Sequence, residues 1–315
     1  MSNRKNGIRI VSTGRALPGT IITNEELSRR VDTSDEWIRS RTGIAQRYQC
    51  GKETCLSLAV SAAREAMESG GIDPEEIGVI LTASSSRDYI FPSASCLVQR
   101  ELGISEEVTA FDLSAACTGF MLALQTARGL LQNGKKPYAL IIGSEELSRI
   151  LDYSDRSSCI LFGDGAGAVI VELSEQPYIQ KSWSRGNVDA LNCPGAGRGE
   201  QKLSMDGRAV FRFAVAAMEQ AITEVLQEAG RELEEVDLIL CHQANERIIR
   251  HVQKKYRGQE EKFYLNIDRY ANTSAASIPI ALDELNREGR LKEGMKLVLA
   301  GFGAGLTWSG AYLEL

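Results

Sequence analysis

An internal repeat constrains the fold of this chain more than any other feature of its sequence. Residues 65–83 (EAMESGGIDPEEIGVILTA) align without a gap with residues 224–242 (EVLQEAGRELEEVDLILCH). Each segment has the pattern of a helix end, a glycine, an acidic turn and a buried strand. Farther along, residues 139–143 (ALIIG) match residues 297–301 (LVLAG), within one residue of the same register. Chance similarity is the alternative, but the register persists over a long span, so we predict two related halves.

The repeat also predicts the fold class. A strand, helix, strand order in each half calls for parallel strands joined by crossover helices, which indicates an α/β fold. At 315 residues and 34.5 kDa the chain exceeds one typical core. The pattern breaks near residues 172–185, so we assign residues 1–175 to the first half and residues 176–315 to the second.

Composition limits the partners that we expect. The net charge of −6 argues against nucleic acid, because phosphate binding needs concentrated Lys and Arg. No apolar run approaches the roughly 20 residues that a membrane span requires, so we expect no membrane association. The seven cysteines are odd in number and contain no CxxC pair, so we expect neither a disulfide framework nor a metal site. A cytoplasmic protein fits this pattern.

Cys117 is the candidate nucleophile. It follows a strand-like run at residues 108–113 and precedes a helical pattern, so it should lie at a helix N-terminus. There the helix dipole and the free N–H groups favour a thiolate. Small neighbours such as Ala116 and Gly119 would let a substrate approach closely. A buried structural cysteine is the alternative, since that is the usual environment of a free Cys.

His242 and Asn272 are the candidate partners of this cysteine. His242 directly follows a strand-like run, at the carboxyl end where open α/β sheets bind ligands. Asn272 lies at a turn before a helix, and its counterpart in the first half is Ser114, close to Cys117. If a pseudo-twofold axis relates the halves, these turns should converge. A core histidine or a capping asparagine is the alternative for each residue taken alone.

Three short segments have patterns typical of binding sites or turns. Residues 163–168 (GDGAGA) lie between apolar runs and do not open a helix, so we interpret them as a turn between strands and expect no NAD. Residues 301–308 (GFGAGLTW) follow a strand and could bring backbone N–H groups to a reacting carbonyl; a tight turn is the alternative. Residues 33–36 (TSDE) predict a capping box and a short helix that presents Trp37 and Arg41 on one face.

With these residues in place, the chain resembles β-ketoacyl-acyl-carrier-protein synthase III, the initiating condensing enzyme of the thiolase-like superfamily. The matching motifs are SDEWIRSRTGI (34–44), FPSAS (91–95), AACTGF (115–120), DRSSCILFGDGAGA (155–168), CHQAN (241–245), NTSAAS (272–277) and GFGAGLTW (301–308). The resemblance implies central mixed sheets in a layered α-β-α-β-α arrangement and a homodimer. It also implies acyl-coenzyme A and an acyl carrier protein as partners, with no separate cofactor.

The resemblance assigns roles to individual residues. It implies that Cys117 is acylated, and that His242 and Asn272 bind the malonyl thioester carbonyl. The backbone N–H groups of Cys117 and Ala304 would form the oxyanion site. Substrate or coenzyme A contacts are implied at Trp37, Arg41, Arg156, Gly207, Asn245 and Phe302. The acyl pocket would include Phe91, Leu147, Phe162 and Leu191, with a core role as the alternative. The carrier protein would dock on a basic face of Arg212, Arg247, Arg250 and Lys254, for which a solvated charged surface is the alternative.

Some positions depart from the family pattern. Ala304 replaces the middle one of three glycines, and its methyl group leaves the backbone N–H in place if φ is negative. Thr118 and residues 187–199 also differ, which leaves the acyl preference open.

The expected reaction is the decarboxylative condensation of a short acyl-coenzyme A with malonyl-acyl-carrier protein, which initiates fatty acid synthesis. One alternative is a related synthase that uses a longer, branched or aromatic primer. A second is a papain-like cysteine peptidase, whose Cys, His and Asn follow the same order along the chain. A third is a non-catalytic acyl-binding relative.

Overall fold

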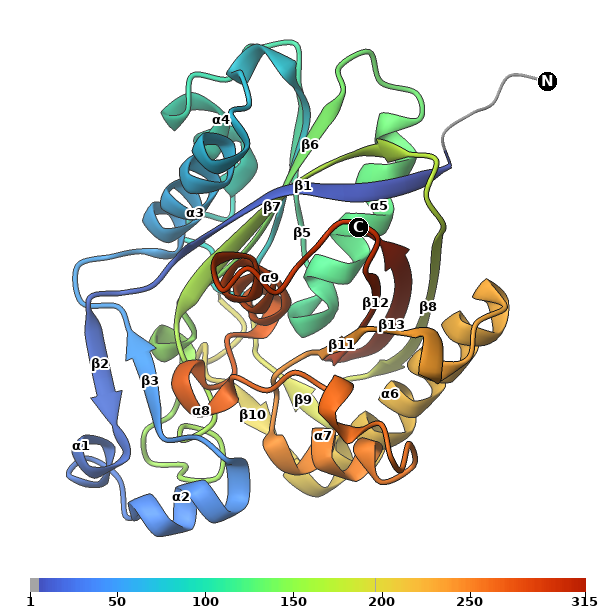
Figure 1. Ribbon diagram of the computed structural model, residues 1–315. Coiled ribbons are helices and arrows are strands. Elements are labelled where there is room, and N and C mark those ends of the chain that lie inside the picture. Colours follow the sequence, from blue (N-terminus) through green and yellow to red (C-terminus); the bar gives the residue numbers. More distant parts are fainter. Residues whose placement is uncertain (1–5, 196) are drawn as a thin grey trace.

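Two mixed β-sheets form the framework of the protein (Figure 1). The computed structural model describes residues 6–195 and 197–315. The first sheet has the strand order β1 (Gly7–Ala16), β7 (Gly165–Ser174), β6 (Tyr138–Glu145), β4 (Ile77–Ala83) and β5 (Thr109–Leu113). The second has the order β8 (Tyr178–Asn187), β13 (Gly305–Glu314), β12 (Lys296–Gly303) and β11 (Leu238–Cys241). Strand β4 is parallel to β5 and β6, and β11 is parallel to β12, whereas the other neighbours are antiparallel.

Helices α5 (Gly119–Leu131) and α9 (Ser277–Arg287) form the layer between the sheets. α5 contacts β4 and β6 of the first sheet and also β12 and β13 of the second, and α9 packs on β1, β7 and β11. One apolar cluster therefore joins both sheets and both helices, for example through Leu81, Leu124, Leu282 and Leu299. Burial of this cluster is the main stabilising contribution at the centre of the molecule.

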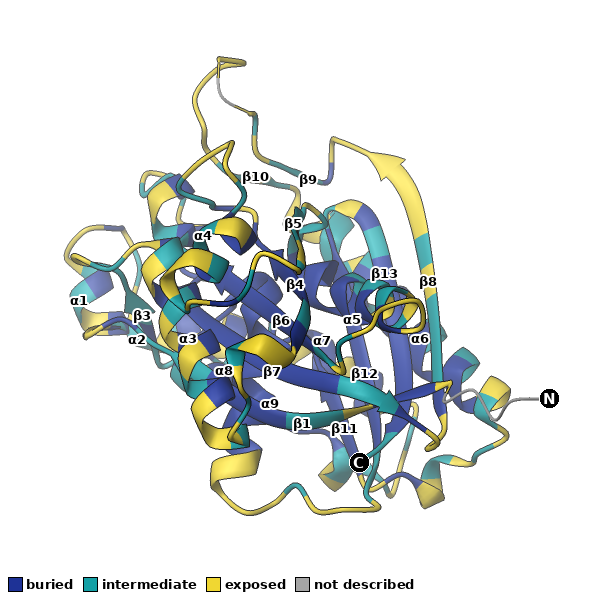
Figure 2. Ribbon diagram, turned by 90° about the horizontal axis from the view of Figure 1, so that it is seen from above, coloured by how far each residue is buried: buried dark blue, intermediate teal, exposed yellow. Residues whose placement is uncertain are grey.

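The remaining long helices cover the outer faces. α3 (Cys55–Gly70) and α4 (Ala94–Glu101) pack on the first sheet, and α6 (Gly207–Ala229) packs on the second, with α7 (Glu246–Gln253) against α6. In α3 the apolar residues recur at helical spacing, so that Leu58, Ala62 and Ala66 are buried while the opposite face is exposed (Figure 2). The layered α-β-α-β-α prediction is thus confirmed.

The internal repeat corresponds to matching structural elements. α3 is followed by Gly71 and α6 by Gly230, both in the left-handed conformation with φ of 62°, which glycine adopts without a steric penalty. A short 3-10 turn then leads into β4 or β11, through η1 (Pro74–Glu76) or η4 (Leu233–Glu235). Farther on, the matched segments lie in β6 and β12. The prediction of two duplicated α/β halves is confirmed.

The chain passes from the first sheet to the second through residues 175–177, between β7 and β8. The division into residues 1–175 and 176–315 stays a prediction, because α9 of the second half also packs on the first sheet. Residues 1–5 of that division and Ala196 lie outside the described residues. Within the described ranges, no helix combines the length and apolar character that crossing a bilayer requires.

A small layer beside the first sheet contains β2 (Thr20–Thr23), β3 (Gln46–Gln49), α1 (Asn24–Ser28) and α2 (Asp35–Thr42). The predicted short helix is α2, but its cap differs from the prediction. Ser34 is the N-cap, and its hydroxyl accepts a hydrogen bond from the Trp37 N–H at 3.1 Å. The third helical position is Trp37, which has no acceptor to return the bond, so the predicted capping box is wrong.

Residues 163–168 also differ from the prediction. Residues 165–168 are the first residues of β7 rather than a turn, and the residues before 163 form turns rather than a strand. The Asp164 carboxylate is buried and accepts hydrogen bonds from the N–H groups of Cys50 (2.8 Å) and Ser148 (2.9 Å). The segment therefore joins distant loops. In the predicted loop at residues 187–199, β9 (Leu191–Asn192) pairs with β10 (Ser204–Met205). The last short helix is α8 (Ile267–Tyr270).

Candidate active site

Cys117 lies in a 3-10 turn, η2 (Ala116–Thr118), between the end of β5 and the start of α5. The preceding residue, Ala116, has a φ of 45°, a conformation that non-glycine residues adopt rarely and mainly at functional sites. Gly119 permits close packing beneath this turn, because a Cβ atom there would lie 2.8 Å from the Cβ of Ala83. The fold thus holds Cys117 at the N-terminus of a helix, as predicted.

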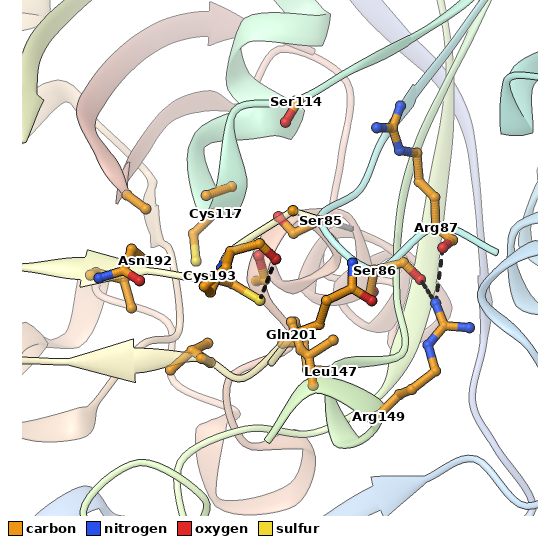
Figure 3. Close-up of a pocket in the computed structure, with 18 of the residues that line it drawn as sticks. Ser85, Ser86, Arg87, Ser114, Cys117, Leu147, Arg149, Asn192, Cys193 and Gln201 are labelled. Atoms are coloured by element: carbon orange, nitrogen blue, oxygen red, sulfur yellow. Dashed lines mark hydrogen bonds between the residues drawn. The ribbon is translucent and has the colours of Figure 1, made fainter. Parts of the chain in front are cut away.

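Two cavities meet at Cys117. The first cavity, of about 980 Å³, is lined at depth by Cys117, His242, Asn272 and Phe302. The second cavity, of about 830 Å³, extends from Cys117 past Leu147 toward Arg149 (Figure 3). Phe162 and Leu191 line both cavities. A group attached to the sulfur atom could therefore occupy one cavity while a second molecule enters the other.

His242 follows β11 and is 1% exposed. Burial lowers the pKa of its imidazole to about 3, so the ring is neutral at physiological pH. The Nδ1 atom lies 2.7 Å from the Ser277 hydroxyl, and the ring packs edge-on against Phe302 with centroids 5.4 Å apart. With Nδ1 engaged, Nε2 is the atom left to bind a ligand in the first cavity.

Hydrogen bonds to both the backbone and the side chain fix the position of Asn272. Its N–H donates to the Leu161 carbonyl at 2.9 Å, and its own carbonyl accepts from the Gly163 N–H at 3.0 Å. The side-chain Oδ1 accepts from the Ser274 N–H at 2.8 Å. The planar amide then offers its NH₂ group as a donor. The structure thus brings Cys117, His242 and Asn272 to one cavity from three distant segments.

The protonation state of Cys117 differs from the prediction. Burial raises the pKa of its thiol to about 12, hydrogen bonding with Ser274 lowers it in part, and the negative charge of Glu145 raises it further. The expected resting thiolate is therefore wrong. The helix N-terminus acts over about one turn, whereas removal of the sulfur from water penalises the charged form more strongly here.

The turn at Ala304 lies against the backbone of Cys117. A Cβ atom added at Gly303 would lie 2.9 Å from the Cys117 nitrogen and 3.1 Å from the Thr118 nitrogen. Ala304 itself has a negative φ, since among the described non-glycine residues only Ala116, Ala271 and Ser274 have positive values. The methyl group of Ala304 is therefore tolerated, and residue 303 is the position that requires glycine.

The predicted coenzyme A contacts gather around the first cavity. Trp37, Arg41, Gly207, Asn245 and Phe302 line it. Arg156 does not line it directly, but its guanidinium lies 5.3 Å from the ring centroid of Trp37. The Asn245 amide donates to the Arg41 carbonyl at 3.1 Å, so the end of α2 and the start of α7 are tied together across the cavity.

The predicted acyl residues separate into two groups. Leu147, Phe162 and Leu191 line the second cavity, as do Ile150 and Leu203, which sequence patterns did not single out. Phe91 does not line either cavity, and its side chain is 83% exposed. The prediction that Phe91 lines the acyl pocket is therefore wrong for the single chain. The loop before α4 directs Phe91 outward, together with Ile90, which is 71% exposed.

The predicted basic face lies partly at the first cavity. Arg212 and Arg247 line its outer part together with Arg208, and the Arg247 guanidinium lies 5.7 Å from the ring centroid of Phe211. Exposed Arg250 pairs with Glu246 at 2.5 Å on α7, which reduces its net contribution. Exposed Lys254 caps the end of α7. Arg208 was not predicted from the sequence, because a single Arg next to a glycine matches no binding motif.

The chain is similar to known proteins over nearly its whole length. The family model described as 3-oxoacyl-[acyl-carrier-protein] synthase III matches residues 111–185, and the model of its C-terminal region matches residues 226–315. A β-ketoacyl-[acyl-carrier-protein] synthase III from Clostridium acetobutylicum is 44% identical, over 98% of this chain and 99% of the relative. The chain belongs to the synthase III family.

Solved structures of synthase III enzymes agree with this assignment. The enzyme from Aquifex aeolicus VF5 has a TM-score of 0.93 and 43% identity, over 98% of this chain and 100% of that chain. The enzyme from Pseudomonas aeruginosa PAO1 has a TM-score of 0.92 and 37% identity, over 98% of both chains. A papain-like peptidase is not favoured, because the similarity to synthase III extends over nearly the whole chain.

Two residues near the nucleophile were not predicted from the sequence, Ser274 and Glu145. Ser274 lines the second cavity with Cys117 and has a φ of 50°. Glu145 ends β6 with its carboxyl group buried. The run GSEEL at residues 143–147 looks like an ordinary strand end followed by a polar turn. Only a charge at the end of a buried strand could have drawn attention to Glu145.

Proposed function

We propose that this synthase III catalyses the decarboxylative condensation of a short acyl-coenzyme A with malonyl-acyl-carrier protein, giving a 3-oxoacyl-acyl-carrier protein and initiating fatty acid synthesis. The observation that carries the proposal is the position of Cys117 where the two cavities meet. A condensing enzyme needs this arrangement, because the acyl group must stay on the sulfur while a second thioester reaches it.

The first half-reaction is thiol–thioester exchange. The acyl-coenzyme A enters past Trp37 and Arg41, and its acyl group comes to lie in the second cavity beside Leu147 and Phe162. The Cys117 sulfur attacks the thioester carbonyl, and the coenzyme A sulfur leaves. A thioester and a thiol are exchanged for another thioester and thiol, so the exchange has no large thermodynamic cost. We expect the N–H groups of Cys117 and Ala304 to stabilise the oxyanion.

The second half-reaction uses His242 and Asn272. The malonyl thioester takes the place of coenzyme A, and its carbonyl oxygen accepts hydrogen bonds from the His242 Nε2–H and the Asn272 amide. Loss of carbon dioxide places negative charge on this oxygen, which the two donors stabilise. One such donor is typically worth about 3 kcal/mol of the barrier. The enolate carbon then attacks the acyl group on Cys117 and releases the sulfur.

In this proposal His242 acts as a neutral imidazole. A protonated histidine would also stabilise an enolate, but the low pKa of His242, caused by burial, keeps the ring uncharged. When the Ser277 hydroxyl donates its hydrogen bond to Nδ1, the His242 proton is on Nε2, which faces the substrate. The site thus provides hydrogen-bond donors without a charged acid.

The outer part of the first cavity supports carrier-protein binding. The opening is lined by Arg208, Arg212 and Arg247. Lys254 lies at the C-terminal end of α7, the helix that contains Arg247. This surface suits an acidic partner, since complementary charge raises the rate of encounter.

We further propose that the protein forms a homodimer in the cytoplasm. β5 lies at the edge of the first sheet with Phe111 37% exposed. Tyr89, Ile90 and Phe91 are exposed in the loop before α4, and α4 packs on β5. An open strand edge beside an exposed apolar loop is typical of a protein interface.

The proposed function can be tested by weighing the intact protein. Incubation with acetyl-coenzyme A should add one acetyl group, located on the peptide that contains Cys117. Addition of malonyl-acyl-carrier protein should remove the acetyl group and yield the 3-oxobutyryl carrier protein. The proposal fails if a panel of short acyl-coenzyme A esters leaves the mass unchanged, or if the acyl enzyme forms but Cys117→Ala forms it equally well.

A further inference from the structure

The buried carboxyl group of Glu145 is not used in the reaction described above. Glu145 ends β6, is 0% exposed and lies behind the wall of the second cavity. Its Oε2 accepts hydrogen bonds from the Ser86 hydroxyl (2.6 Å) and the Ser85 N–H (3.0 Å), and Ser85 and Ser86 line the cavity (Figure 3). Its Oε1 is buried and has no hydrogen-bond partner among the described residues.

Ser274 connects this carboxyl group with the nucleophile. Ser274 begins the 3-10 turn η6 (Ser274–Ala276), which packs against both η2, the turn that carries Cys117, and β6, the strand that ends at Glu145. Ser274 lines the second cavity with Cys117, and its left-handed φ of 50° is maintained at a local cost in free energy. The unpaired Oε1 is the natural acceptor for a Ser274 hydroxyl that shifts toward it.

The protonation of Cys117 leaves a step unexplained. The neutral thiol is a poor nucleophile, and His242 is too weak a base to accept its proton because burial lowers the His242 pKa to about 3. Burial raises the pKa of Glu145 to about 7, near the pH at which a general base is most effective. Glu145 and Cys117 repel each other when both are ionised, so the pair favours one shared proton.

We propose that Glu145 accepts the Cys117 proton during acyl transfer, through the hydroxyl of Ser274. The thiol donates its proton to the Ser274 oxygen as Ser274 passes its own proton to Glu145 Oε1. The sulfur then forms a bond to the thioester carbon, and the bond from that carbon to the coenzyme A sulfur breaks. The proton returns along the same path to the departing sulfur, so Glu145 ends as a carboxylate. Because it acts through Ser274, Glu145 is a positioning residue.

The other ionisable groups around Glu145 do not replace it. Cys55 on α3 points into the same polar cluster, but burial raises its pKa to about 12. Glu146 and Asp88 lie farther along the loops, and each pairs with Arg149, at 3.6 Å and 3.3 Å. Within the described residues, no ion pair involves Glu145 itself. No neighbouring cation therefore holds Glu145 in its ionised form, and it can accept a proton from Cys117.

Alkylation of Cys117 by iodoacetamide tests this proposal. The proposal rests on the proposed function only because that function identifies the acyl donor. The rate is measured from pH 5.5 to 9 by the mass of the Cys117 peptide. In the unaltered enzyme it should rise through about pH 7 and then level off, because ionised Glu145 is the proton acceptor. In Glu145→Gln it should fall about 10²-fold at pH 7 and rise tenfold per pH unit without a plateau.

Further variants separate this role from a purely structural one. Ser274→Ala should reproduce the Glu145→Gln profile, whereas Glu145→Asp should keep the inflection. Glu146→Gln, which removes the neighbouring carboxylate, should leave the profile unchanged. The proposal is overturned if Glu145→Gln and Ser274→Ala keep the profile of the unaltered enzyme, or if either is alkylated faster. Should Glu145→Gln fail to fold, Ser274→Ala decides the question.

The same samples distinguish failure of this proposal from failure of the proposed function. If the unaltered enzyme shows the plateau but takes no acyl group from any coenzyme A ester, the proposed function fails and the role of Glu145 in thiol activation stands. If acylation occurs and the plateau is missing, the role of Glu145 is wrong and the proposed function stands.

Discussion

The Nδ1 atom of His242 lies 2.7 Å from the hydroxyl oxygen of Ser277, at the start of α9. The same oxygen accepts a hydrogen bond from the Gln243 N–H at 3.3 Å. Its hydroxyl hydrogen is therefore available to Nδ1, and the histidine proton is then on Nε2. Ser277 thus decides which ring nitrogen can donate to a substrate.

Ser277→Ala should slow condensation and leave acylation of Cys117 unchanged. Loss of one hydrogen bond that fixes the tautomer is worth about 1 kcal/mol, or roughly a fivefold to tenfold fall in the rate of malonyl decarboxylation. The release of carbon dioxide measures this rate, and acetyl transfer serves as the control. Equal losses in both half-reactions would show that Ser277 acts on the fold instead.

His242 should make stability depend on pH. Its pKa is lowered to about 3 in the folded state, so the unfolded chain binds the extra proton first as the pH falls below 6.5. The contribution of neutral His242 is therefore present above about pH 6.5 and is lost as the pH falls. Between pH 6.5 and 5.5 the unaltered protein should lose about 1 kcal/mol relative to His242→Gln, measured by urea unfolding. A constant difference between the two proteins would contradict this.

Residues 303 and 304 should respond oppositely to a methyl group. In Gly303→Ala the new Cβ would lie 2.9 Å from the Cys117 nitrogen, so the backbone must shift, at a cost of about 1–3 kcal/mol. Acyl-enzyme formation should fall tenfold or more. Ala304→Gly, the matched removal of a methyl group from the next residue, should change the rate less than threefold. An active Gly303→Ala enzyme would disprove the close approach.

Lys254→Glu should weaken the use of carrier-bound malonate. We expect a severalfold increase in KM at low ionic strength that diminishes at high salt, because exposed charges are screened. Lys135→Glu is the matched control, since Lys135 is a 90% exposed side chain in the first half. A change in KM for acetyl-coenzyme A as large as that for the carrier protein would argue against docking at α7.

Phe111→Lys should separate the proposed dimer. The substitution places a charge on the edge strand β5, where Phe111 is 37% exposed, and a charge on an edge strand opposes pairing with another chain. Light scattering after gel filtration should then show half the mass of the unaltered protein. Ile21→Lys is the control, because Ile21 is 43% exposed and lies on β2, in the separate sheet of β2 and β3. A monomeric unaltered protein would refute the interface.

Local patterns in the sequence were sufficient for the repeated elements and for the three candidate residues. A glycine after α3 and after α6, followed by an acidic turn and an apolar strand, depends on residues only a few positions apart. Such signals survive in any context that lets the helix bury its apolar face. The same reasoning located Cys117 at a helix N-terminus, and His242 at the end of a buried strand.

Only the tertiary structure decided how these groups behave. The Cys117 thiol is protonated rather than ionised because segments far along the chain, including β12 and η6 (Ser274–Ala276), exclude water from it. Phe91 faces outward, and Glu145 lies behind the cavity, for the same kind of reason. Desolvation and the walls of a cavity depend on which distant residues meet in space, and sequence spacing contains no measure of that distance.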